Sequence, residues 1–208
     1  MTNRAGKSVA MTLVWLAAVA LLDAQRPTPQ SVADELADAD LRYAAVAART
    51  TVVPALTPMF AADVIMPAPP GTLAKGRDAV VAALTANPDN ATGRLAWAPV
   101  RVGVSADGRQ GFTFGFMTLT KGDGTVVPLK YMTYWAKGAD GWRAVAYKRA
   151  RRPEGAPDTA MMPPALPAAL VPAVAVSDAT RKGLADAEQA FSDRAQVIGL
   201  GPAFAEFG

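Results

Sequence analysis

Two stretches of this chain read alike, LADADLRYAAVAARTTVVPALTPMF at residues 36–60 and LADAEQAFSDRAQVIGLGPAFAEFG at residues 184–208. Adding 148 to each residue number in the first gives its counterpart in the second, with no gap. Alanine matches mean little in so alanine-rich a chain, so the likeness depends on three kinds of position, acidic, aromatic and proline: Asp40 with Glu188, Tyr43 with Phe191, and Pro54 with Pro202. An internal repeat indicates a duplicated structural unit. The alternative is two unrelated amphipathic segments with a chance match.

The repeat predicts how the chain is divided. We expect one complete domain at residues 31–152, a linker rich in proline and alanine at residues 153–176, and the first helices of an incomplete second copy at residues 177–208. Residues 160–176 carry no charge, so a membrane segment has to be considered. Their prolines break helical hydrogen bonding, which favours an extended, semi-rigid linker instead.

The N-terminus has the pattern of a secretory signal peptide. Arg4 and Lys7 precede an apolar run from Val9 to Leu22, and we place the signal at residues 1–24. The apolar run is shorter than the roughly 20 residues that span a bilayer, so an uncleaved anchor is the less favoured alternative. We therefore expect an exported protein, periplasmic or extracellular, without a stable membrane span after removal of the signal.

The composition excludes several kinds of chemistry. The chain has neither cysteine nor histidine, which rules out disulfides and nucleophiles activated by histidine. Zinc sites built from nitrogen and sulfur ligands are ruled out as well, and no acidic ligand loop of known spacing appears. We therefore predict no metal and no cofactor.

The charge is close to balanced. The formal net charge of +3 favours neither a nucleic-acid partner nor an anionic membrane. A basic run, Lys148–Arg152, ends the last expected strand. We interpret it as a solvated strand end, the alternative being a surface for an anionic ligand or partner.

Hydrophobic periodicity indicates helices first and strands later. Ser31 is expected to cap a helix whose stripe carries Leu36, Asp40 and Tyr43. The further expected elements are a short helix at 54–60, a strand at 63–66, a loop at 67–71, a helix at 76–86, and strands at 94–105, 111–120, 125–137 and 142–149. Short turns between the last four strands predict an antiparallel meander, so the fold class is α+β.

Several phrases along the chain carry a resemblance to a known family. They are Ala39-Asp40, Lys75-Gly76-Arg77-Asp78-Ala79-Val80, Ser105–Gly115, Tyr134–Lys137 and Gly141-Trp142-Arg143. In this order they resemble the NTF2-like superfamily, with its SnoaL-like and ketosteroid-isomerase-like families, and most closely its DUF4440 group. The resemblance implies a cone in which three N-terminal helices pack on a curved antiparallel sheet around an apolar cup. We expect a homodimer, or pairing of the domain with the second copy that the repeat predicts. The resemblance is nearly silent on function.

Enzymes of this fold typically use a carboxylate base, sometimes with a tyrosine. The resemblance therefore makes Asp40, Asp63 and Tyr131 the candidate catalytic residues. Asp40 lies on an apolar stripe, where burying a carboxylate is costly. It therefore needs either a hydrogen-bonding partner or a functional role. Because Glu188 repeats the acid, we favour a shared structural hydrogen bond.

Aromatic side chains on the expected strands are candidates for contacting a ligand: Trp97, Tyr131, Tyr134 and Trp135. Most such residues are expected in the core, since aromatic rings bury large areas. The favoured function is binding of a small apolar molecule in the cone. One alternative is a cofactor-independent isomerase, cyclase or dehydratase that uses an aspartate and a tyrosine, with the dehydratase disfavoured by the missing histidine. The other is a dimerisation or assembly module.

Overall fold

The chain divides into two units, Met1–Val171 and Pro172–Gly208, in the computed structural model, which describes residues 27–68 and 71–207. The predicted signal peptide lies outside the described residues. The first unit contains, in chain order, α2 (Pro29–Ala47), α3 (Val52–Leu56), the 3-10 turn η1 (Thr57–Met59), β1 (Phe60–Ala68), β2 (Thr72–Lys75), α4 (Arg77–Thr85), α5 (Asp89–Thr92), β3 (Arg94–Val104), β4 (Gln110–Thr120), β5 (Val126–Gly138) and β6 (Gly141–Arg151). The predicted α+β class is confirmed.

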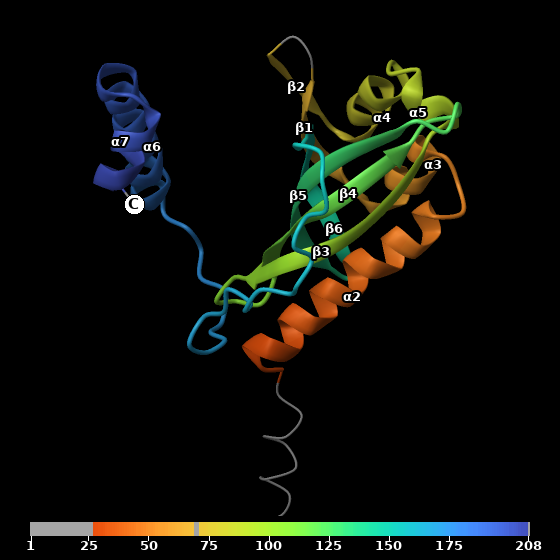
Figure 1. The fold of residues 1–208 in the computed structure, drawn as a ribbon. Helices are drawn as coiled ribbons and strands as arrows, with labels where there is room; N and C mark the ends of the chain where they lie inside the picture. Colours follow the sequence, from red (N-terminus) through yellow and green to blue (C-terminus); the bar gives the residue numbers. More distant parts are fainter. Residues whose placement is uncertain (1–26, 69–70, 208) are drawn as a thin grey trace, which may run out of the picture. The chain divides into compact units, whose positions relative to one another are not determined.

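The strands of the first unit form one curved sheet in the order β2-β1-β6-β5-β4-β3. The meander β3–β6 is antiparallel, as expected from its short turns. The last strand, β6, also pairs with β1, and this pairing is parallel. The sheet is therefore mixed and not wholly antiparallel. Figure 1 shows α2 running along one face of this sheet, with α4 and α5 near the end where β1 and β2 lie.

Helix α2 begins one turn earlier than the sequence predicted. Thr28, and not Ser31, is the N-cap residue, with Pro29 in the first helical position, where proline costs nothing. The hydroxyl of Thr28 accepts a hydrogen bond from the backbone N–H of Ser31, and the Ser31 hydroxyl accepts one from the backbone N–H of Thr28. This reciprocal capping box fixes the start of the helix that carries Asp40.

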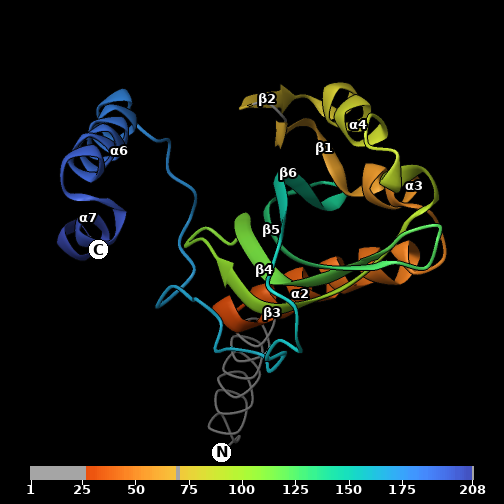
Figure 2. The same ribbon diagram turned by 45° about the horizontal axis from the view of Figure 1, so that its top comes forward.

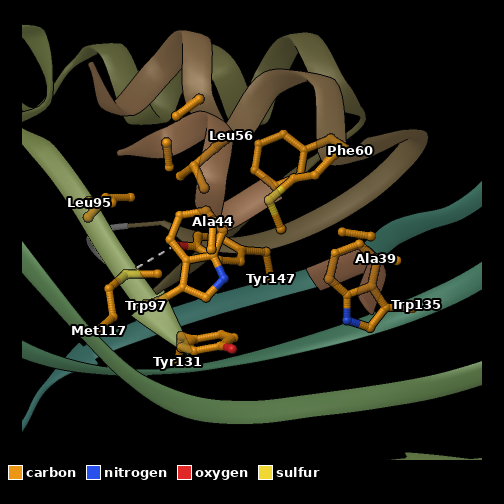
Figure 3. Packing of buried hydrophobic residues seen from close by; sticks show 14 of the residues in the cluster. Ala39, Ala44, Leu56, Phe60, Leu95, Trp97, Met117, Tyr131, Trp135 and Tyr147 are labelled. Carbon is orange, nitrogen blue, oxygen red and sulfur yellow. Dashed lines mark hydrogen bonds between the residues drawn. The ribbon is translucent and has the colours of Figure 1, made fainter. Parts of the chain in front are cut away.

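The core lies between α2, α3 and the inner face of the sheet. Leu36, Leu56 and Phe60 are fully buried there, and the rings of Trp135 and Tyr147 fill the space beside them (Figure 3). The stripe predicted for α2 is therefore the face that packs on the sheet, since alternate residues of β4 and β5 face it. Burial of this apolar surface is the main stabilising contribution to the unit.

Pro67 and Ala68, which were predicted to begin a loop, belong instead to a strand of a hairpin. Strand β1 continues through Pro67 to Ala68, and β2 pairs back on it with Pro67 opposite Leu73. Proline is tolerated there because it stands near the end of a strand at the margin of the sheet. The single turn α5 begins within the predicted helix stop at residues 87–90 and runs on to Thr92.

Part of the segment predicted as a linker belongs to the first unit. The backbone N–H groups of Met162 and Ala165 donate to the carbonyls of Val100 and Val102, both at 2.8 Å. Val104 returns a hydrogen bond of 3.0 Å to the carbonyl of Ala165. These contacts cover the outer edge of β3, which would otherwise present unpaired backbone groups.

The second unit is a helical hairpin of α6 (Asp178–Ile198) and α7 (Leu200–Phe207). It is coloured blue in Figure 2. The ring of Phe191 packs on those of Phe204 and Phe207, with centroids 4.8 and 5.7 Å apart. This aromatic cluster holds the two helices together.

Candidate functional site

Asp40 is the centre of a buried polar cluster. It projects from α2 toward the sheet and is 0% exposed. Its Oδ1 accepts a hydrogen bond of 2.7 Å from the indole Nε1 of Trp97 on β3, and its Oδ2 accepts one of 2.7 Å from the hydroxyl of Tyr131 on β5. The carboxylate thus joins the helix to two strands through both of its oxygens.

The environment shifts the acidity of this cluster. Burial raises the pKa of the Asp40 carboxyl above its ordinary value of 3.8, while the hydrogen bonds from Tyr131 and Trp97 lower it in part. Burial, and next the negative charge of Asp40, raise the pKa of the Tyr131 hydroxyl far above its ordinary value. Tyr131 therefore stays protonated and acts as a donor to Asp40.

The structure joins two of the three candidate catalytic residues and separates the third. Asp40 and Tyr131 share the hydrogen bond described above, whereas Asp63 is exposed on β1. Asp40 and Tyr131 contact protein groups on all sides, since they are 0% and 2% exposed. The arrangement fits the structural hydrogen bond that the sequence favoured for Asp40.

The four candidate ligand residues also lie in different places. Trp97, Tyr131 and Trp135 are buried in the core, where the indole of Trp135 donates to the hydroxyl of Thr113 at 2.9 Å. Tyr134 points to the opposite face of the sheet, beside Phe112 of the neighbouring strand, and is 43% exposed. The period of two along β5 separates these faces, as the sequence indicated.

A cavity of about 620 Å³ opens between β1, α4, α5 and β6, and we call it the α4–β6 cavity. Its volume is in the range of sites that hold small molecules, about 300–1,000 Å³. Apolar groups make up most of its wall, and the polar ones gather on the α5 and β6 side. The lining residues are Met66, Pro67, Ala68, Ala83, Leu84, Ala86, Asn87, Pro88, Asn90, Lys148 and Arg149.

Two polar residues in this cavity are held in place by hydrogen bonds. The amide of Asn90, 1% exposed, donates through Nδ2 to the carbonyl of Leu84 at 2.6 Å. Its Oδ1 accepts a hydrogen bond of 2.6 Å from Nη2 of Arg149. One end of α4 and the single turn α5 thereby fix the guanidinium at the cavity.

The α4–β6 cavity leaves little signal in the sequence. Asn90 falls in the predicted helix stop, and Arg149 falls in the run predicted to be a solvated strand end. The available signal was the basic run Lys148–Arg152, for which an anionic ligand was the alternative. Only the pairing of β6 with β1 and β5 turns Arg149 inward, next to Tyr131 on the neighbouring strand.

Acidic clusters that could bind a metal, and helices that could span a membrane, are both absent from the described residues. Within residues 27–68 and 71–207, no group of three or more acidic side chains comes together in a way that could hold a metal ion. None of the helices described there has the length and apolar character needed to cross a bilayer.

No family model matches this chain, and no curated protein matches it. Solved structures that it resembles include a ketosteroid isomerase-like protein from Erwinia carotovora atroseptica SCRI1043, with 19% identity, a TM-score of 0.45, and coverage of 57% of this chain and 95% of that chain. An NTF2-like protein of unknown function from Pseudomonas putida KT2440 has 15% identity and a TM-score of 0.47, covering 60% of this chain and 89% of that one. An NTF2-like protein with a cystatin-like fold from Novosphingobium aromaticivorans has 21% identity and a TM-score of 0.42, covering 66% and 87%.

The structural neighbours of this chain are thus NTF2-like and ketosteroid isomerase-like proteins. Identities of this size carry no activity from one protein to another. The more specific DUF4440 assignment stays a prediction.

Proposed function

We propose that the first unit binds a small apolar molecule in the α4–β6 cavity. The observation that carries the proposal is a cavity of about 620 Å³ with mostly apolar walls and a few fixed polar groups on one side. Met66 and Leu84, which belong to the core, also form part of the wall, so the cavity lies directly against the folded interior. Binding there removes apolar ligand surface from water, which is favourable.

The core supports binding at this cavity and not at the Asp40 cluster. Trp97, Tyr131, Trp135 and Tyr147 fill the space between α2 and the sheet with their own rings (Figure 3). A ligand in that space would have to displace packed aromatic side chains, at a cost of several kcal/mol by comparison with large core substitutions. The α4–β6 cavity requires no such displacement.

The test is a titration of the full chain with 2-naphthalenemethanol, a neutral apolar probe, followed by thermal unfolding and calorimetry. A ligand that binds the folded state raises the unfolding temperature with concentration. Ala83→Phe places a ring in the cavity and should abolish the rise. Ala82→Phe makes the same change on the exposed side of α4 and should leave the rise unchanged.

Either of two results would contradict the proposal. The first is a flat unfolding temperature for the unaltered chain up to millimolar probe. The second is equal binding by the unaltered chain and a correctly folded Ala83→Phe variant, which would place the probe elsewhere.

A further inference from the structure

Arg149 lines the α4–β6 cavity as a cation without an anionic partner. Its Nη2 donates to the neutral amide of Asn90, and the ion pairs of the described residues involve other side chains. Its Nη1 is buried and, in the described part of the chain, has no hydrogen-bond partner. A guanidinium left in this state forgoes both a hydrogen bond and charge compensation, which is costly in a partly apolar environment.

The surroundings of Arg149 are those of a positioned group and not of a mobile surface side chain. Asn90, which receives Nη2, is itself fixed to the carbonyl of Leu84. Burial raises the pKa of the Tyr147 hydroxyl to about 12, and the positive charge of Arg149 lowers it in part. Arg149 is also the cross-strand partner of Tyr131, so it lies beside the aromatic core as well as at the cavity.

The charge of the cavity wall is positive. Lys148 lines the cavity next to Arg149, and its lining includes no aspartate or glutamate within the described residues. Such a wall attracts anions, and the planar guanidinium can bind a carboxylate through two parallel hydrogen bonds.

We propose that the ligand of the α4–β6 cavity is an amphipathic carboxylate, whose acid group binds Arg149 and whose apolar body contacts Met66, Ala83 and Leu84. The inference rests on the proposed function, because it names the chemical class bound at that same cavity. A singly charged head pairs with the guanidinium of Arg149, which Asn90 holds in place, whereas Lys148 is exposed to water. The apolar wall excludes small hydrophilic anions as the preferred ligands, since they bury no hydrocarbon.

The experiment compares two probes that share a ring system and differ in charge. The full chain is titrated at pH 7 with 2-naphthoate and with 2-naphthalenemethanol by calorimetry. We expect 2-naphthoate to bind at least tenfold more tightly. Arg149→Met should lower 2-naphthoate affinity at least tenfold and change alcohol affinity by less than twofold.

A matched control removes the same charge elsewhere. Lys130→Met changes an exposed cation on β5 that does not line the cavity, and both affinities should stay as in the unaltered chain. If Arg149→Met does not fold, Arg149→Lys keeps the charge without the planar fork and should lower 2-naphthoate affinity severalfold.

The outcomes separate the two proposals. If neither probe binds the unaltered chain, the proposed function fails, and the acid preference fails with it. If both probes bind equally, the proposed function stands and the carboxylate inference is overturned. Unchanged 2-naphthoate affinity in a folded Arg149 variant overturns it as well.

Discussion

At the scale of single residues, the Asp40 cluster shows what one acid contributes inside an apolar interface. Its two oxygens are satisfied by two donors on different strands, so helix α2 is held in one position along the sheet. A charge-assisted hydrogen bond contributes about 1.5–3 kcal/mol, more than a bond between neutral groups. The cluster therefore gives specificity as well as stability to the interface between helix and sheet.

Two buried tyrosines allow this contribution to be measured. Tyr131→Phe removes the donor to Asp40 and should lower the free energy of unfolding by about 1.5–3 kcal/mol. Tyr147→Phe is the matched control, because Tyr147 is equally buried, at 2% exposed, and its hydroxyl donates a weak hydrogen bond to the sulfur of Met117 at 3.9 Å. The control should cost less than about 1 kcal/mol. Urea unfolding at pH 7 measures both, and equal losses would show that Asp40 gains little from Tyr131.

The sequence predicted part of this cluster. Helical spacing placed Asp40 on the buried stripe and implied that it needs a partner. The partners lie 57 and 91 residues further along the chain, and which strand residue reaches Asp40 depends on strand register and curvature. Asn90 and Arg149 are a similar case, since their hydrogen bond joins α5 to β6 across 59 residues.

At the scale of elements, the antiparallel meander β3–β6 could be predicted from the sequence. The pairing of β2 with β1, and of β1 with β6, could not. Alternating residues and turn-forming glycines identify β3–β6 locally. Strand β2 is short and follows a run rich in proline and glycine, which is typical of a loop. The parallel pairing of β1 with β6 joins segments far apart in the sequence, with a shift in register between Phe60 and Ile65. Such pairing leaves no local signal.

The covered edge of β3 gives a prediction at this scale. A Cβ added at Gly103 would overlap Cε1 of Phe112 and would lie 3.0 Å from the Cβ of Ala165. Gly103→Ala should therefore cost about 1–2 kcal/mol, because the Phe112 ring and the covering segment must move to relieve overpacking. It should also speed hydrogen exchange of the Ala165 amide, which donates to Val102.

The control for this change is another strand glycine in open space. Gly138 has no atom within 4 Å of an added Cβ, so Gly138→Ala should change stability by less than about 0.5 kcal/mol. Unaltered exchange at Ala165 in the Gly103→Ala chain would mean that the covering segment does not depend on this close contact.

At the scale of the whole molecule, the helices of the second unit begin and end near the positions that the repeat hypothesis gives them. Adding 148 to the numbers of α3 and η1 together gives the span of α7, and the same shift places α2 within three residues of α6 at either end. In the first unit Leu56 and Met59 are buried, whereas their counterparts Phe204 and Phe207 are 59% and 46% exposed. The tandem repeat stays a prediction, now with similar helix bounds in the two copies.

The acidity of Asp40 affects the stability of the whole unit. Below pH 3.8 the carboxyl holds its proton in both the folded and the unfolded chain. Between 3.8 and its raised folded-state pKa, only the folded chain keeps the proton, so the free energy of unfolding falls as pH rises. Above the folded-state pKa this loss is complete and constant. Asp107 and Asp123 have lowered pKa values and act in the opposite direction, with stability lost as pH falls.

Asp40→Asn separates these effects, because Asp107 and Asp123 are common to both chains. The new amide can accept from Trp97 through its oxygen and donate to the Tyr131 hydroxyl through its nitrogen. We expect the stability of the unaltered chain minus that of Asp40→Asn to decline between pH 3.8 and the raised pKa, and then to level off. Urea unfolding of both chains from pH 3 to 8 gives this difference directly. A difference that does not vary with pH would mean that burial leaves the Asp40 pKa at its ordinary value, and one that increases with pH would mean that the hydrogen bonds from Trp97 and Tyr131 outweigh burial.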